Sequence, residues 1–246
     1  MIYLTGDVHI FSGNNWEQKS AGSELTASKR YLSILKKYKI SSTLFLNGKL
    51  LENNPVEVKE LLDFDVEIGG HTYNNFGKMG IIKSYLNRKI FGAIYGSKGF
   101  QARDIKRTKN SFDKLGIKMD SWRTHAFGSN NNTFILLGNF GIKYVSDLVG
   151  DIKPLKEDKT IQIPINIPID QNTISYGKLS PENHDPFASC TKNRISKEEW
   201  FEILKKRIIK NEKENVDSVI LIHPITMAAL DNFVLFEEIA KFLSKY

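Results

Sequence analysis

The sequence predicts an α/β fold in which a parallel, barrel-like sheet is surrounded by helices, with residues 1–246 forming a single domain. Short apolar runs alternate with amphipathic segments of helical spacing along most of the chain, and this alternation is typical of parallel sheets. Counting the alternations gives about six or seven β/α units, which is a barrel-like number. Barrels of roughly 250 residues are ordinary single domains, and no internal repeat or linker interrupts the pattern.

The first half of the chain begins this alternation. Residues 13–23 are polar and rich in glycine, serine and asparagine, which predicts a loop after the first strand. Asn54 is a residue type that caps helices, and Pro55 suits the first helical position. We expect strands within residues 1–10, 43–46 and 66–68, and helices over residues 25–38 and 55–63.

The second half continues the alternation up to its most apolar run. Ser196, followed three residues later by Glu199, has the pattern of a capping box. Residues 171–193 are a long polar stretch, either a functional lid or a partly disordered loop. We expect helices over residues 101–115, 132–140, 196–212 and 233–246, and strands over residues 117–122, 143–146, 161–163, 165–167 and 219–222.

Composition indicates a globular protein with an ample core. Hydrophobic residues make up 41% and charged residues 26% of the chain. The net charge of +7 comes from scattered lysines, many beside glutamates, so we expect no nucleic-acid partner. Cys190 is the single cysteine, which excludes an intramolecular disulfide and a zinc-finger set. The N-terminus has no basic region followed by an apolar run, and no stretch approaches the ~20 apolar residues of a membrane helix. We therefore expect a cytoplasmic protein without stable membrane insertion, and its oligomeric state stays open.

Polar side chains that carry chemistry follow the apolar runs. Alternate residues of a strand point to the same side, so Asp7 and His9 can reach into one pocket. If the strands are parallel, all such residues gather at one rim of the sheet. The alternative is a structural role for each: a turn cap, a surface histidine, a backbone-bonded histidine or a surface ion pair. The residues at expected strand ends are Asp7, His9, His71, Arg123 and His223.

These stretches together resemble the polysaccharide deacetylase family, also called the NodB-homology or carbohydrate esterase 4 family. The resemblance implies a deformed (β/α) barrel with a divalent metal on its C-terminal face. It also implies hydrolysis of an N-acyl group, most often N-acetyl, from a sugar or related amide. The motifs that carry the resemblance are Leu4-Thr-Gly-Asp-Val-His9, Thr43-Leu-Phe-Leu-Asn-Gly-Lys49 with Asn54-Pro55, Val66-Glu-Ile-Gly-Gly-His-Thr-Tyr73, Trp122-Arg-Thr-His125 and Ile220-Leu-Ile-His-Pro224.

The resemblance implies three metal ligands, His9, His71 and Asn75. His9 falls on the family's metal-binding carboxylate, and imidazole is an accepted zinc ligand. His71 matches the first histidine of the second motif, whereas Asn75 stands at the second histidine position. An amide oxygen is a weak, neutral ligand, so this departure lowers the expected metal affinity. His125 or His184 could supply a replacement.

The resemblance also implies catalytic roles for Asp7, Arg123 and His223. Asp7 matches the general base; in an alternative alignment it is a metal ligand and Gly6 takes the base position. Arg123 matches the arginine that keeps the base ionised through a charge-assisted hydrogen bond. His223 matches the histidine that protonates the leaving amine.

Two supporting groups are implied as well. A backbone amide near Ala126 would donate to the oxyanion. A carboxylate should orient His223, and Asp147 and Asp170 are the candidates.

The function implied is a metal-dependent hydrolase, with zinc as the expected metal, that removes an N-acyl group from a small carbohydrate or glycoconjugate. The alternative, favoured by Asn75, is a catalytically impaired barrel that binds a carbohydrate or metabolite.

Overall fold

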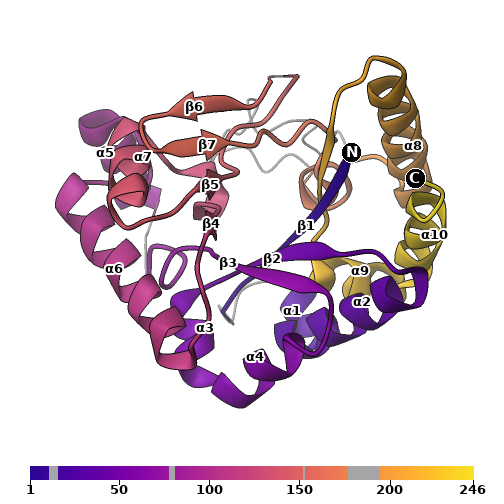
Figure 1. Ribbon diagram of the computed structural model, residues 1–246, viewed down its shortest axis with the longest axis horizontal. Coiled ribbons are helices and arrows are strands. Elements are labelled where there is room, and N and C mark those ends of the chain that lie inside the picture. The colour runs from indigo at the N-terminus through magenta and orange to yellow at the C-terminus, as the bar shows by residue number, and fades with distance from the viewer. Residues whose placement is uncertain (11–15, 78–80, 152, 177–193) are drawn as a thin grey trace.

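The computed structural model describes residues 1–10, 16–77, 81–151, 153–176 and 194–246. Its strands form one curled sheet in the order β6-β7-β5-β4-β3-β2-β1-β8 (Figure 1). Every pair of neighbours is parallel except β6 and β7, which are antiparallel. The strands are β1 (Ile2–Val8), β2 (Ser42–Leu46), β3 (Val66–Gly70), β4 (Ser121–Trp122), β5 (Tyr144–Val145), β6 (Leu155–Glu157), β7 (Thr160–Gln162) and β8 (Ser218–Leu221).

Helices surround the outer face of this curled sheet (Figure 1). Among the described residues, no helix is both long and apolar enough to cross a bilayer. The α-helices are α1 (Trp16–Ala21), α2 (Glu24–Tyr38), α3 (Gly48–Asn53), α4 (Pro55–Leu61), α5 (Ile81–Phe91), α6 (Lys98–Leu115), α7 (Asn131–Asn139), α8 (Lys197–Lys213), α9 (Pro224–Asp231) and α10 (Val234–Leu243). The described residues also form two shorter turns, the 3-10 turn η1 (His125–Phe127) and the π-helical turn η2 (Gln171–Ser175).

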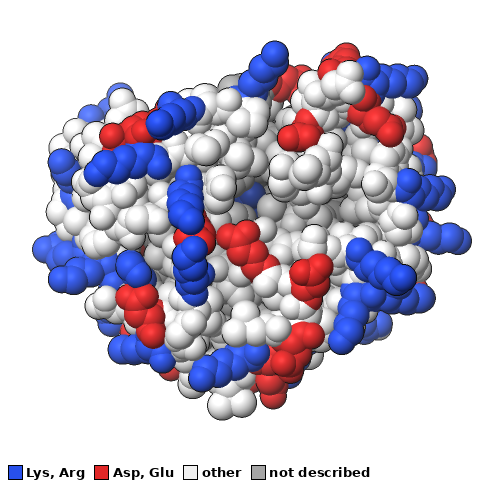
Figure 2. All heavy atoms as spheres, in the orientation of Figure 1, with Lys and Arg blue, Asp and Glu red and all other residues white. Residues whose placement is uncertain are grey.

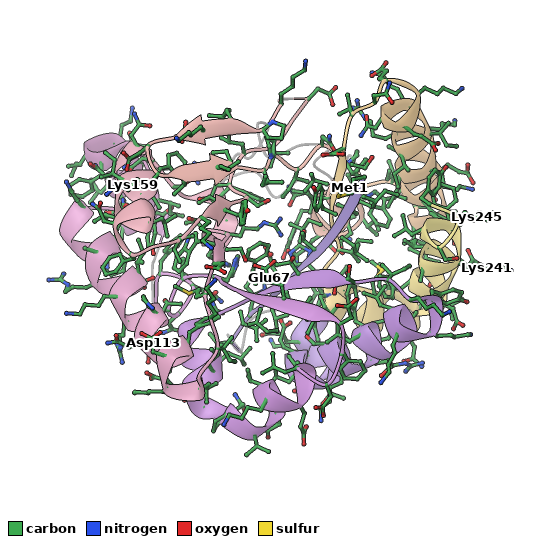
Figure 3. All side chains as sticks on the ribbon, in the orientation of Figure 1. Met1, Glu67, Asp113, Lys159, Lys241 and Lys245 are labelled. Atoms are coloured by element: carbon green, nitrogen blue, oxygen red, sulfur yellow. The ribbon has the colours of Figure 1, made fainter. Side chains whose placement is uncertain are left out.

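The two faces of the sheet differ in polarity. Leu44, Trp122 and Ile220 are fully buried and belong to the main apolar core. Residues of the opposite parity, such as Asp7, face the inside of the curl. Glu67, on the same parity of β3 as His71, lies near the middle of Figure 3, inside the ring of helices. The inside of the barrel therefore carries charged groups from which a site can form, together with a smaller apolar cluster that includes Val219 and Leu221.

An irregular segment covers the gap between the two ends of the sheet. Ile165 forms an isolated parallel bridge with Val149 and is fully buried. On its other side Asn166 exchanges two hydrogen bonds with Val219 of β8, donating from its backbone N–H at 3.3 Å and accepting at its side-chain oxygen at 2.9 Å. These contacts join the β5 side of the sheet to β8, which extends the half-barrel toward closure.

The α/β barrel prediction is confirmed: in the described residues the sheet has seven mutually parallel strands, and β6 adds an antiparallel edge. Most predicted helices and strands appear within a few residues of their expected bounds. The capping box of Ser196 and Glu199 is present at the start of α8. Figure 2 shows acidic and basic side chains interspersed on the viewed face, so the positive charge is not gathered into one stripe there.

Several local predictions were wrong. Residues 16–21 of the expected loop form α1, and the strand expected over residues 117–122 pairs only at β4. Residues 165–167 make only the isolated bridge, because they lie between two strands that are not adjacent. Asn54 does not cap α4 with its side chain, since its Nδ2 donates to the Leu50 carbonyl oxygen at 3.1 Å, at the end of the unpredicted α3. Residues 177–193, with His184 and Cys190, lie outside the described residues.

Candidate active site

The site lies at the carboxyl ends of the central strands. β1 brings Asp7 and His9 to the inner side, and His71 follows β3 directly. Gly70 allows β3 to pack closely on β4, because a Cβ atom there would stand 2.5 Å from the Trp122 ring. A side chain at this position would push apart the two strands that place His71 and Arg123.

Three imidazoles converge at this rim. His9 Nε2 lies 3.1 Å from His71 Nε2, which lies 3.3 Å from His125 Nδ1. One nitrogen from each ring falls within 4.8 Å of the others. Zinc bound tetrahedrally at about 2.0–2.1 Å holds its ligand nitrogens about 3.3 Å apart. The donor type and spacing therefore fit a zinc ion.

Burial keeps His9 and His71 neutral. It lowers the pKa of His71 to about 4, against the opposing effect of Asp7. It also lowers the pKa of His9 well below its ordinary value, and the neighbouring His71 and His125 lower it further. The neutral ring is the form that binds a metal, so the cluster is ready to do so at neutral pH.

Asp7 forms a buried ion pair beside the imidazoles. Its Oδ1 accepts a hydrogen bond from Arg123 Nη1 at 2.9 Å, and its Oδ2 lies 3.9 Å from His71 Nε2. Although burial alone would raise the pKa of Asp7, the Arg123 guanidinium and the surrounding imidazoles hold it well below its usual range. Asp7 is thus ionised at neutral pH and faces the cluster.

The Arg123 side chain is fixed on every side. It is fully buried and donates to Thr5 Oγ1 at 3.0 Å, to Ser146 Oγ at 2.8 Å and to the Ser146 carbonyl oxygen at 3.1 Å. The guanidinium also lies 4.4 Å from the centre of the Phe45 ring. A guanidinium held by this many partners cannot turn away from Asp7.

Asp170 is the carboxylate that faces His223. Its Oδ1 lies 2.7 Å from His223 Nδ1, and its Oδ2 accepts the His223 backbone N–H at 2.8 Å. Burial alone would lower the pKa of His223, but Asp170 raises it to about 9. Asp147, the other candidate, instead accepts from the Thr124 backbone N–H and hydroxyl, both at 2.6 Å, and so anchors the turn that carries His125.

Sequence reasoning missed a second carboxylate near His9. Glu24 Oε1 lies 4.0 Å from His9 Nδ1, on the side of the ring away from His71. Burial raises the pKa of Glu24 to about 8, and its Oε2 has no hydrogen-bond partner within the described parts of the chain. Its helical neighbours Ser28 and Tyr31 are buried too, and this spacing is the signal from which its burial could have been predicted.

The backbone near the cluster adopts rare conformations. Thr72, Asn75 and Ala126 have positive φ angles of 58°, 44° and 52°. Such strain is costly for residues other than glycine and gathers at functional sites. Asn75 is half-buried, and its Oδ1 is without a hydrogen-bond partner among the residues that the structure describes.

Comparison with known proteins identifies the family of the chain. A model of the polysaccharide deacetylase family matches residues 20–145, about half of the chain. The chain therefore belongs to the polysaccharide deacetylase family. No curated protein sequence matches it.

Solved structures of this fold are similar over nearly the whole chain. One assigned as a polysaccharide deacetylase from Mycobacterium smegmatis has a TM-score of 0.75 at 18% identity, covering 99% of this chain and 83% of that one. Puue allantoinase has a TM-score of 0.68 at 12% identity, with coverages of 100% and 84%. A CE4-family pseudoenzyme from Bacillus anthracis has a TM-score of 0.51 at 16% identity, with coverages of 97% and 60%. At these identities the likeness shows the shared fold.

Proposed function

We propose that this protein is a metal-dependent hydrolase that removes an N-acyl group, most often N-acetyl, from an amino sugar or small glycoconjugate. The observation that carries the proposal is the convergence of three imidazole nitrogens beside an ion-paired Asp7. Membership of the polysaccharide deacetylase family supports the reaction class.

His9, His71 and His125 would hold the metal, with His125 in place of Asn75. Imidazole is a far better zinc ligand than an amide oxygen. When bound, zinc supplies a Lewis acid for the acyl carbonyl and lowers the pKa of water toward ~7.

The other residues move and hold protons. Asp7 takes a proton from the attacking water, and Arg123 keeps this carboxylate ionised and oriented for that transfer. His223 gives a proton to the departing nitrogen as the C–N bond breaks and the new C–O bond forms. Asp170 keeps His223 protonated for this step.

Release of acetate from N-acetylated amino sugars tests the proposal. We expect activity that disappears with a chelator and returns with zinc. Asp7→Asn should lower kcat/KM by about 10²–10⁴-fold while the folded protein still binds zinc, because the proton acceptor is lost and the three imidazoles remain. Activity that survives the chelator, or an Asp7→Asn variant as active as the wild type, would contradict it.

A second candidate is a barrel that binds a carbohydrate without hydrolysing it. Asn75 at the second histidine position favours it, and a pseudoenzyme among the similar structures shows that this fold also exists without activity. Saturable sugar binding with neither bound zinc nor acetate release would select this alternative.

The pH dependence of activity tests the role of His223. Because its pKa is raised to about 9, His223 stays protonated up to that pH, and kcat/KM should fall as the pH rises through about 9. The His223–Asp170 pair should contribute its full stability below pH 6.5, the ordinary pKa of histidine. This contribution should be lost as the pH rises through about 9. In Asp170→Asn the negative charge beside His223 is gone, so burial lowers the pKa of His223. The fall in kcat/KM should therefore shift to lower pH by roughly two units or more. Identical alkaline limbs for both proteins would exclude His223 as the acid.

A further inference from the structure

Helix α5 exposes an apolar stripe. Ile82, Leu86 and Ile90 are 77%, 47% and 66% exposed. They are spaced four residues apart, so they lie along one side of the helix. Tyr85 is exposed on the same side.

The inner side of α5 is polar. Among the α5 side chains that the structure describes, Ser84, Asn87 and Arg88 are the partly buried ones, and Asn87 Nδ2 donates to the Ile94 carbonyl oxygen at 3.0 Å. A surface helix of a globular protein normally has the reverse arrangement, with its apolar stripe toward the core. The stripe on α5 therefore does not stabilise this fold, and an apolar surface of this kind marks an interaction site.

The charged residues of α5 and of the neighbouring sequence are all positive. Lys83 and Lys89 are exposed on α5 beside the apolar residues. No acidic residue occurs in the sequence between Glu67 and Asp104. The basic residues of this interval are Lys78, Lys83, Arg88, Lys89, Lys98 and Arg103. This charge disfavours pairing with a second copy of the same helix and favours an anionic occupant.

Helix α5 is joined to the segment that carries His125. Asn130 Nδ2 donates to the Phe91 carbonyl oxygen at 2.9 Å, and the Tyr95 backbone N–H donates to the Gly128 carbonyl oxygen at 3.2 Å. In Figure 1, α5 lies beside α7, at the end of the molecule away from α8 and α10. A surface that contacts α5 would therefore lie near the rim of the site.

We propose that α5 docks the protein on an anionic lipid bilayer. Ile82, Leu86 and Ile90 enter the boundary between head groups and acyl chains, while Lys83 and Lys89 contact lipid phosphates. An amphipathic helix with apolar residues and lysines binds such surfaces by burying its apolar side chains and by electrostatic attraction to the anionic lipids. The attachment is peripheral and reversible, because α5 alone is too short to span the bilayer.

Vesicle co-sedimentation of the full chain tests this proposal. Vesicles of phosphatidylcholine alone are compared with vesicles of equal parts phosphatidylcholine and phosphatidylglycerol. We expect the wild type to bind the anionic vesicles at least tenfold more strongly. Leu86→Ser/Ile90→Ser should weaken this binding about tenfold, and Lys83→Gln/Lys89→Gln should weaken it by about fivefold per lysine.

A matched control removes exposed apolar residues elsewhere. Val56 on α4 and Val234 on α10 are 65% and 61% exposed, so Val56→Ser/Val234→Ser should bind vesicles like the wild type. Thermal unfolding followed by circular dichroism verifies that each variant is folded. Equal binding to both vesicle types, or unchanged binding of the α5 variants, would overturn the proposal. So would a dimer that light scattering detects in the wild type and not in Leu86→Ser/Ile90→Ser, since a second copy would then cover the stripe.

Discussion

Replacing His71 with alanine should remove bound zinc from the protein. His71 Nε2 is the central atom of the cluster, within 3.3 Å of a nitrogen of both other rings. Its loss leaves two ligands, and losing even an outer partner of a ligand weakens metal binding by 10–100-fold, so we expect the zinc dissociation constant to rise by roughly a hundredfold or more. Mass spectrometry of the protein after dialysis against zinc would measure the metal content.

A matched pair of variants tests which residue completes the site. His125→Ala should lose zinc as His71→Ala does, whereas Asn75→Ala should retain it. Zinc lost from Asn75→Ala and kept by His125→Ala would instead assign the third position to Asn75. Near-stoichiometric zinc in His71→Ala would contradict a site centred on this residue.

Replacing Arg123 with methionine should destabilise the folded protein by about 3–5 kcal/mol, because it leaves the buried Asp7 charge without its partner. Arg123 is fully buried, and its contacts to Thr5 and Ser146 would be lost as well. Urea unfolding at neutral pH followed by circular dichroism would measure the change in the free energy of unfolding.

Two further variants separate this effect from simple loss of an arginine. In Asp7→Asn/Arg123→Met the unpaired charge is gone, so much of the stability should return. Arg207 pairs with Asp151 at 2.8 Å on the surface, and Arg207→Met should change stability by no more than about 1 kcal/mol. If Arg123→Met and the double variant lost the same amount of unfolding free energy, the loss would come from packing and not from the unpaired charge of Asp7.

Much of the fold could be predicted because its elements have strong local patterns. The run that forms β8 is buried along its whole length, as expected for a strand inside a parallel sheet. Helix α5 could not be predicted in this way, since Ile82, Leu86 and Ile90 face solvent, whereas Ser84, Asn87 and Arg88 are its partly buried residues among the side chains that the structure describes. In β4 only Ser121 and Trp122 pair with β3 and β5. No pattern in the sequence of residues 117–122 indicates that the pairing is limited to these two residues.

The sequence by itself determined which residues stand at strand ends, and parallel pairing then brings Asp7, His71 and Arg123 to one rim. It could not show that His125 lies beside His71, because that approach depends on the positive-φ turn that follows β4. Nor could it choose Asp170 over Asp147 as the partner of His223, since Asp170 arrives on the irregular segment beside β8. These choices belong to the tertiary structure, because contacts between residues far apart in the sequence leave no periodic pattern in the chain.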